Sequence, residues 1–249
     1  MLKTICVIPT YNEKDNILTL IEQLQALYPE LHILVVDDNS PDGTGAIVEQ
    51  MKNVKIDVLH REYKEGLGSA YLAGFKKALS EGADIIIQMD ADLSHEPVYI
   101  KAMLEKIKDH DVVIGSRYLN GISIVNWQLS RLILSWFGNA YARFATGIKI
   151  NDLTGGFKCM RRKALEVIDL RRIKTQGYGF QIEMNYAFSK CGLKISELPI
   201  IFYERTKGKS KISKFMVLEA MIKVFFFRFK NYATKTKLST KAMFVKGPL

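Results

Sequence analysis

The sequence has few cysteines, and they are not arranged as a site. Cys6, Cys159 and Cys191 are the three cysteines of the 249-residue chain, and none of them belongs to a CxxC pair. A disulfide framework and a cysteine-based zinc site are therefore both excluded. Because widely spaced free thiols fit a reducing compartment, we expect a cytoplasmic protein.

The chain also lacks a long uninterrupted hydrophobic run. Its first residues pass directly into the strand-like segment Thr4–Ile8, without the charged and apolar regions of a signal peptide. The longest apolar stretch, Phe215–Phe227, is interrupted by Glu219 and Lys223 and is shorter than the ~20 residues that cross a bilayer. We therefore expect neither a signal peptide nor a transmembrane helix.

Two common nucleotide-binding fingerprints are missing. Gly66 and Gly68 would need a third glycine at position 71 to form the dinucleotide-binding motif, and that position is Tyr71. Gly208-Lys209-Ser210 resembles the end of a P-loop, but the leading glycine would fall on Tyr203. The sequence thus excludes both the dinucleotide-binding and the P-loop classes.

What the chain does have is an excess of positive charge. Lys and Arg total 36 against 26 Asp and Glu, which gives a net charge of +10. Such a charge favours a polyanionic partner, namely a nucleic acid, an anionic membrane surface or a phosphorylated substrate. No nucleic-acid-binding motif is recognisable, so we expect no nucleic-acid partner.

Short apolar segments alternate with helix-period segments in the first ninety residues. This alternation predicts one α/β domain with a mostly parallel sheet flanked by helices. Polar clusters follow the strands, so we expect them to meet in one cleft at the carboxyl ends. The expected strands are Ile5–Ile8, Ile33–Val36, Lys55–Leu59, Ile85–Gln88 and Val112–Gly115, and the expected helices are Lys14–Leu27, Thr44–Met51 and Ser69–Ser80.

The pattern is looser in the second half of the chain. Trp127–Phe144 is expected to form one helix or a helix pair with a partly uncovered apolar face. Mixed sections follow at Lys158–Val167 and Gln181–Lys190, and Ile195–Tyr203 is strand-like. No internal repeat is visible.

An acidic motif, Asp90-Ala91-Asp92, follows the predicted strand Ile85–Gln88. In an extended segment residues i and i+2 point the same way, so both carboxylates can reach one hard cation such as Mg²⁺ or Mn²⁺. The structural alternative is that these aspartates only cap a helix or form a turn. For this motif alone, the spacing does not decide between the two.

Several sequence blocks taken together resemble the dolichyl-phosphate (polyprenyl-phosphate) mannose synthases, which are inverting glycosyltransferases of family 2 with the GT-A fold. The resemblance covers roughly residues 4–213. Its blocks, in family order, are VIPTYNE (7–13), VDDNSPDGT (36–44), GLGSAY (66–71), MDADLSH (89–95), GSRY (115–118), DLTGGF (152–157) and GKSK (208–211).

This resemblance implies roles for the acidic and apolar residues of the first half. Pro9, Tyr11 and Glu13 would line the base and ribose, and Val36 and Asp38 would hold the base. Glu13 could instead be a first-turn residue of the following helix, and we expect Asp37 to be a buried strand-end partner. Asp90, Ala91 and Asp92 would contact the ribose, the diphosphate and a Mg²⁺ or Mn²⁺ ion, with Asp90 and Asp92 as metal ligands and Asp92 as a catalytic residue.

The resemblance also assigns the basic residues. Arg117 and Arg205 would be catalytic and would contact both the donor diphosphate and the acceptor phosphate, because guanidinium groups suit phosphate oxygens. Lys211 would contact the nucleotide sugar, and Arg131 the acceptor phosphate. The alternative for each is a solvated surface residue, and for Arg131 the polar face of an amphipathic helix.

The reaction implied is mannosyl transfer from GDP-mannose to dolichyl or polyprenyl monophosphate with inversion. A phosphate monoester is largely dianionic at neutral pH, with a second pKa of roughly 6, so no general base is needed. We therefore expect a structural role for His95, near the start of a helix, and a structural or sugar-contacting role for Asp152. UDP-glucose as donor and a glycan hydroxyl as acceptor are the alternatives.

The C-terminal part is expected to bind a membrane. We divide the chain into a catalytic domain, residues 1–213, and an amphipathic helix with a polar tail, residues 214–249, on the cytoplasmic face of a membrane. A membrane-anchoring subunit or a homodimer is a further expected partner, and packing of this helix onto the core is the alternative. The expected apolar face consists of Phe215, Met216, Leu218, Met221, Ile222, Phe225, Phe226 and Phe229, and its basic border of Lys214, Lys223, Arg228 and Lys230.

Overall fold

The computed structural model describes residues 2–51, 53–204, 223–227 and 230–233. In this part of the chain, a seven-stranded sheet has the order β3-β2-β1-β4-β7-β5-β8. Its strands are β1 (Thr4–Thr10), β2 (His32–Asp37), β3 (Ile56–His60), β4 (Ile85–Gln88), β5 (Val112–Ser116), β7 (Lys158–Arg161) and β8 (Ile195–Pro199). The short strands β6 (Ile124–Val125) and β9 (Phe202–Tyr203) pair with each other.

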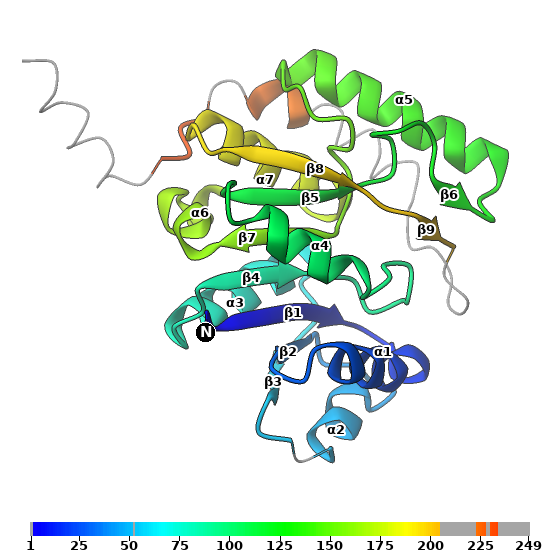
Figure 1. The fold of residues 1–249 in the computed structure, drawn as a ribbon, viewed down its shortest axis with the longest axis vertical. Helices are drawn as coiled ribbons and strands as arrows, with labels where there is room; N and C mark the ends of the chain where they lie inside the picture. The colour runs from blue at the N-terminus through cyan, green and yellow to red at the C-terminus, as the bar shows by residue number, and fades with distance from the viewer. Residues whose placement is uncertain (1, 52, 205–222, 228–229, 234–249) are drawn as a thin grey trace, which may run out of the picture.

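Helices cover both faces of this sheet (Figure 1). Residues of α1, α2 and α4 form one core cluster with one face, and residues of α3, α5, α6 and α7 form a second cluster with the other. The helices are α1 (Lys14–Leu27), α2 (Thr44–Glu49), α3 (Leu67–Ser80), α4 (Tyr99–Lys106), α5 (Leu129–Thr146), α6 (Arg162–Val167) and α7 (Gly177–Lys190), with a 3₁₀ turn at Leu170–Arg172.

Strands β1, β2, β4 and β5 are buried on both faces, which explains their continuous apolar sequences. In β1, Val7 faces α3 whereas Cys6 and Ile8 face the α1 side. Helix α3 approaches β1 closely at Gly74, where a Cβ atom would lie 2.3 Å from Cγ1 of Val7. The predicted α/β fold with a mostly parallel sheet and flanking helices is therefore confirmed.

One strand runs against the others. Strand β7 is antiparallel to both of its neighbours, β4 and β5, whereas the remaining pairs of the large sheet are parallel. In this register the first residue of β7, Lys158, lies opposite Gln88 of β4 and Ile114 of β5. The start of β7 therefore lies at the carboxyl ends of β4 and β5.

The C-terminal segment contributes to the core. Val224, Phe227 and Tyr232 are each 1% exposed and belong to the cluster under α5 and α7. Lys230 Nζ and Tyr232 Oη donate hydrogen bonds of 2.6 and 3.0 Å to Oε1 of the buried Glu183. For Val224 and Phe227, which lie in a short helical segment, the packed-helix alternative holds. The domain boundary at residue 213 stays a prediction.

Other residues of the predicted amphipathic helix have different outcomes. Phe225 and Phe226 are more than half exposed, at 53% and 55%, whereas the neighbouring Val224 is buried. The rest of the expected apolar face, its basic residues Lys214 and Arg228, and the polar tail lie outside the described residues.

Helix α5 is one continuous helix. Of the two possibilities predicted for Trp127–Phe144, the single helix is therefore the one observed. It lies at the end of the molecule opposite β3 (Figure 1). Six of its large apolar side chains are at least 46% exposed: Leu129, Ile133, Leu134, Trp136, Phe137 and Phe144. We call these six residues the α5 outer face. Among the described helices, α5 included, none meets the length and hydropathy needed to traverse a membrane.

Candidate active site

The predicted site residues lie along one edge of the sheet. Because β1 to β5 are parallel and pair in the order β3-β2-β1-β4, with β7 between β4 and β5, their carboxyl ends meet at this edge. Tyr11 follows β1, Asp38 follows β2, Asp90 follows β4 and Arg117 follows β5. Tyr11 and Asp38, which were predicted to contact the nucleotide, therefore lie at the β2 end of this edge, and Arg117 lies at the β5 end.

At the β2 end, Asp38 is held by protein donors. Its Oδ1 accepts a hydrogen bond of 2.5 Å from Arg61 Nη1, and its Oδ2 accepts one of 3.1 Å from the backbone N–H of Gly66. Arg61 also pairs with Glu65 and donates to Ser69 Oγ at 2.8 Å. Arg61 was not among the predicted residues, because nothing in its local sequence marks it as the partner of a distant aspartate.

The other residues predicted to contact the nucleotide lie nearby. The Nζ atom of Lys64 lies 3.7 Å from the centroid of the Tyr11 ring. Glu13 is the N-cap residue of α1, one residue before the first turn that its structural alternative proposed, and its Oε2 accepts from Asn16 Nδ2 at 3.0 Å. Contact of Glu13 with the nucleotide stays a prediction. Pro9 and Val36 are opposite each other in β1 and β2 and are buried. Contact of these two with a base stays a prediction.

Asp37 has the structural role that the sequence suggested. It is 3% exposed and its Oδ1 accepts hydrogen bonds from Thr10 Oγ1 at 2.8 Å and from Ser40 Oγ at 2.6 Å. Its Oδ2 accepts from the Ser40 backbone N–H. These bonds fix the turn that follows β2.

In the Asp90-Ala91-Asp92 motif, each carboxylate has a protein donor. Tyr71 Oη donates to Asp90 Oδ1 at 2.6 Å, and Ser94 donates to Asp92 Oδ1 through its N–H at 3.2 Å and its Oγ at 2.5 Å. Burial and the Asp90 charge raise the pKa of Tyr71 well above its usual value, so it stays a hydrogen-bond donor. The Asp92–Ser94 bonds form a local turn, which is the structural role that the sequence analysis gave as the alternative to metal binding. They involve only Oδ1 of Asp92. Ala91 is buried.

The chemistry of this motif suits a magnesium-like ion. No group of three or more Asp, Glu, His or Cys side chains within the described ranges could hold a metal. Mg²⁺ and similar hard cations are commonly bound by one or two carboxylates together with water and substrate phosphates. Asp90 and Asp92 therefore fit a metal shared with a diphosphate, and not an all-protein cage.

His95 lies behind this motif. It is 2% exposed, its Nδ1 accepts a hydrogen bond of 3.3 Å from the Asp90 N–H, and its ring stacks on Phe157 at 5.1 Å. Burial lowers the pKa of His95, so the ring is neutral at pH 7. This geometry agrees with a structural role, although α4 begins only at Tyr99.

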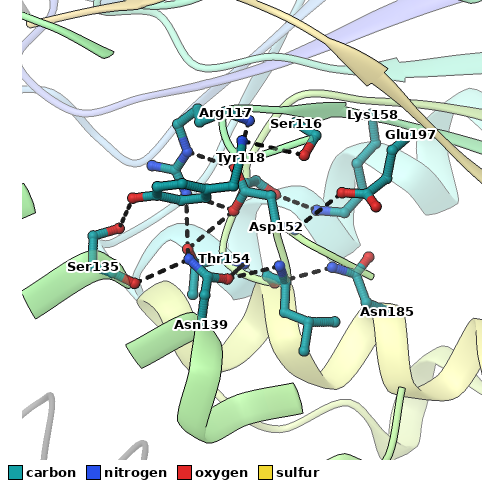
Figure 2. A network of polar contacts seen from close by, with 12 residues as sticks. Ser116, Arg117, Tyr118, Ser135, Asn139, Asp152, Thr154, Lys158, Asn185 and Glu197 are labelled. Atoms are coloured by element: carbon teal, nitrogen blue, oxygen red, sulfur yellow. Dashed lines mark hydrogen bonds and ion pairs between the residues drawn. The ribbon is translucent and has the colours of Figure 1, made fainter. Parts of the chain in front are cut away.

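At the β5 end, Arg117 is paired with Asp152 inside the protein (Figure 2). Arg117 Nε donates to Asp152 Oδ2 at 2.6 Å, and Nη2 donates to Asp152 Oδ1 at 2.7 Å and to Thr154 Oγ1 at 2.8 Å. Burial alone would raise the pKa of Asp152, but the charge and hydrogen bonds of Arg117 outweigh it and hold the pKa below its ordinary value. Asp152 is therefore an ionised partner of Arg117.

This pairing limits what Arg117 can do. Two of its three nitrogens bind Asp152 and Thr154, and Nη1 donates no hydrogen bond to any residue within the described ranges. The rings of Tyr118, Trp127 and Phe202 have centroids 5.3 to 5.7 Å from the guanidinium carbon. The guanidinium is thus fixed in orientation by Asp152, Thr154 and the three rings.

Arg131 of α5 lies at the same end. Its Nη1 donates to Glu204 at 2.7 Å, and its guanidinium lies over the Trp127 ring at 4.0 Å. Arg131 Nε and Trp127 Nε1 are buried donors without a hydrogen-bond partner in the described part of the chain. Unpartnered buried donors are costly and are expected where an anion binds. Arg205 and Lys211 lie outside the described residues.

Comparison with known proteins fits this arrangement. Residues 5–169 match the model of the glycosyl transferase family 2, and the chain belongs to this family. It is 42% identical over 225 residues to the undecaprenyl-phosphate mannosyltransferase of Micrococcus luteus, which covers 90% of this chain and 93% of that protein. It is 42% identical over 226 residues to the polyprenol monophosphomannose synthase of Mycolicibacterium smegmatis, covering 89% of this chain and 85% of that one.

Solved structures share the fold at lower identity. A glucosyl-3-phosphoglycerate synthase of Mycobacterium tuberculosis, crystallised with phosphoglyceric acid, superimposes with a TM-score of 0.68 at 18% identity over 91% of this chain and 80% of that one. A mannosyl-3-phosphoglycerate synthase of Rubrobacter xylanophilus gives a TM-score of 0.67 at 19% identity over 92% and 74%. At these identities the likeness shows the GT-A fold alone.

Proposed function

We propose that this glycosyltransferase transfers a mannosyl residue from GDP-mannose to a polyprenyl monophosphate, with inversion at the anomeric carbon. The observation that carries the proposal is the cluster formed by the buried Arg117, held by Asp152, and the unpartnered buried donors Arg131 Nε and Trp127 Nε1 at one end of the strand-end edge. The carboxylates of Asp90 and Asp92 lie on the strand-end edge between this cluster and Asp38. The names of both 42% identical relatives support a polyprenyl-phosphate acceptor.

The donor would lie along the strand ends, with its base near Tyr11 and Asp38 and its diphosphate near Asp90 and Asp92. Asp38 is already held by Arg61 and Gly66, so a base would meet a carboxylate of fixed orientation. Asp90 and Asp92 would hold the divalent cation, Mg²⁺ or Mn²⁺. When bound there, the cation supplies charge neutralisation for the departing nucleoside diphosphate.

The state of Asp152 favours a phosphate acceptor over a hydroxyl acceptor. A hydroxyl needs a general base to remove its proton, but Asp152 is fully buried, bound by Arg117 and has a lowered pKa. A phosphate monoester oxygen is already ionised and needs only to be oriented. Arg117 and Arg131 would orient it for in-line attack on the anomeric carbon, and their fixed positive charges would stabilise the transition state.

A lipid acceptor would also explain why the outer side of α5 is apolar and exposed. The inner side of α5 carries Arg131 and Ser135, and Ser135 accepts a hydrogen bond from Tyr118 beside Arg117. The α5 outer face is apolar and exposed, and the segment 223–227, which carries the exposed Phe225 and Phe226, lies at the same end of the molecule (orange in Figure 1). We infer that this side of the protein lies against the membrane, so that a lipid phosphate reaches Arg117 while its chain stays in the bilayer.

The proposed function is tested by incubating the purified protein with Mn²⁺, a panel of nucleotide sugars and undecaprenyl phosphate, and by measuring product masses. We expect a lipid product one hexose heavier with GDP-mannose, and β configuration by NMR. A product formed mainly from UDP-glucose would replace the donor assignment. Transfer only to glycan hydroxyls would overturn the acceptor assignment.

We expect the double variant Phe137→Ser, Phe144→Ser to bind anionic vesicles about tenfold more weakly than the wild type. Each exposed ring loses apolar contact with lipid, at roughly 25 cal/mol per Å² of area. The measurement is co-sedimentation with vesicles of phosphatidylglycerol and phosphatidylcholine. The matched control is Leu27→Ser, which removes an apolar side chain of 52% exposure on α1. Equal binding by both variants would contradict the assignment of the α5 outer face.

A further inference from the structure

A buried lysine lies beneath the active site and takes no part in the proposed chemistry. Lys158 opens β7 between β4 and β5 and is 0% exposed. Its Nζ donates to Gly155 O at 2.7 Å and to Gln181 Oε1, and within the described ranges it has no carboxylate partner. Burial lowers the pKa of Lys158 to about 7, although the charges of Asp152 and Asp90 oppose this shift. Above this pKa the amine is mostly neutral, and its two N–H groups match its two acceptors.

Gln88 makes a parallel set of contacts. It is the cross-strand neighbour of Lys158, it is also 0% exposed, and its Nε2 donates to Gly156 O at 2.6 Å and to Gln181 Oε1 at 2.8 Å. Lys158 and Gln88 therefore donate to two consecutive backbone carbonyls, those of Gly155 and Gly156. Both also donate to the same side chain of α7, Gln181. We call Lys158, Gln88 and Gln181 the buried clamp.

The two carbonyls belong to a turn that touches both ends of the reaction centre. A Cβ atom on Gly156 would lie 2.9 Å from Asp90 Oδ2, so the backbone of Gly156 packs directly against the proposed metal ligand. A Cβ atom on Gly155 would lie 3.3 Å from Cγ of Asp152, the partner of Arg117. The Gly155–Gly156 turn thus packs against both Asp90 and the partner of Arg117.

We propose that the buried clamp is a positioning device for sugar transfer: by holding the Gly155–Gly156 turn, it sets the relative position of the Asp90 carboxylate and the Arg117 guanidinium. This inference rests on the proposed function, which puts the leaving diphosphate at Asp90 and the attacking phosphate at Arg117. An in-line displacement depends on the distance between these two groups, and a misplacement of about 1 Å can cost ~10²-fold in rate.

The composition of the clamp supports positioning over simple packing. Gln88 Oε1 is buried and has no hydrogen-bond partner in the described part of the chain, and the same holds for Asn185 Oδ1, one helical turn after Gln181. A buried polar cluster with unmet acceptors contributes less to stability than an apolar cluster of the same volume. What the polar cluster provides instead is a fixed direction for two backbone carbonyls.

The test uses the single variants Lys158→Met and Gln88→Met, which keep side-chain length and remove the donor to Gly155 O or to Gly156 O. At pH 8.0 and saturating Mn²⁺ we expect kcat to fall at least ~30-fold in each, with the KM for the nucleotide sugar within about threefold of wild type. KM is expected to hold because Tyr11 and Asp38 follow β1 and β2, away from the turn. The matched control is Thr146→Val, which removes a buried hydrogen bond to Ala142 O in α5.

A second readout does not depend on transfer. Mn²⁺ affinity in the presence of nucleoside diphosphate, measured by electron paramagnetic resonance at pH 8.0, is expected to weaken at least ~5-fold in Gln88→Met and Lys158→Met but not in Thr146→Val, because the turn no longer holds Asp90 in place. If kcat stays within about twofold in both variants, or if kcat and Mn²⁺ affinity fall equally in the control, the inference is wrong. If the wild type transfers nothing to polyprenyl phosphate, the proposed function is wrong. In that case the Mn²⁺ affinities alone test whether the buried clamp positions Asp90.

Discussion

Asp92→Asn is expected to lower kcat at least ~10³-fold at saturating donor and Mn²⁺, which corresponds to about 4 kcal/mol of lost transition-state stabilisation. The asparagine keeps the Oδ1 acceptor that binds Ser94, so the turn after β4 is retained. What it loses is the negative charge that would hold the cation against the diphosphate. The measurement is steady-state transfer to undecaprenyl phosphate, with thermal unfolding to check the fold.

The chain offers a matched control for this variant. Asp169 accepts a hydrogen bond from the backbone N–H two residues ahead, at Arg171, as Asp92 does from Ser94. It precedes the 3₁₀ turn, away from the strand ends that carry the site. Asp169→Asn is therefore expected to transfer sugar at the wild-type rate. Near-normal turnover by Asp92→Asn would show that Asp92 holds only the turn.

Arg117→Ala is expected to lower kcat/KM at least ~10²-fold, on the order of 3 kcal/mol, because the fixed positive charge at the acceptor end is lost. The structure adds a second effect that the sequence did not predict. Removing Arg117 leaves Asp152 buried without the positive charge and hydrogen bonds that stabilise it, which costs roughly 3–5 kcal/mol of folding stability. A low activity of Arg117→Ala could therefore come from the lost positive charge or from partial unfolding, and this variant alone cannot separate the two.

The double variant Arg117→Met, Asp152→Asn separates the two effects. It removes both charges together, so we expect it to unfold at a higher temperature than Arg117→Ala while its kcat/KM stays at least ~10²-fold below wild type. Arg117→Lys should recover only part of the activity, since an ammonium cannot make the two parallel bonds to Asp152. If the double variant transfers sugar within about threefold of wild type, the role of Arg117 is confined to its pair with Asp152.

Local patterns in the sequence predicted the strands and helices up to residue 88, but they gave no bounds for α4 or β6. The helix Lys14–Leu27 and the strand Ile85–Gln88 were predicted with their observed bounds, because each has a clear apolar period and clear breaks at its ends. The family resemblance supplied the GT-A fold and the family, both of which are confirmed. Polar residues after each strand correctly pointed to one edge of the sheet, because parallel strands end together.

The pairings that make the site could not be predicted in the same way. Arg61 and Asp38 are 23 residues apart, and Arg117 and Asp152 are 35 apart, so no local period links them. Lys158 is a lysine at the start of a short strand, where solvent exposure is the ordinary expectation, and only the antiparallel insertion of β7 buries it. The same long-range packing brings Val224 and Phe227 into the core, although their neighbours Phe225 and Phe226 are exposed.

The insertion of β7 also sets the order in which the protein can be assembled during synthesis. Strands β1 to β4 pair with one another and are complete by residue 88, so this half of the sheet can form as soon as it leaves the ribosome. Strand β5 pairs only with β7 and β8 among the described strands, and β7 begins at residue 158. A ribosome-bound chain arrested between residues 116 and 158 would therefore carry only the β1–β4 half of the sheet, which we propose binds the donor, and β5 would have no strand to pair with.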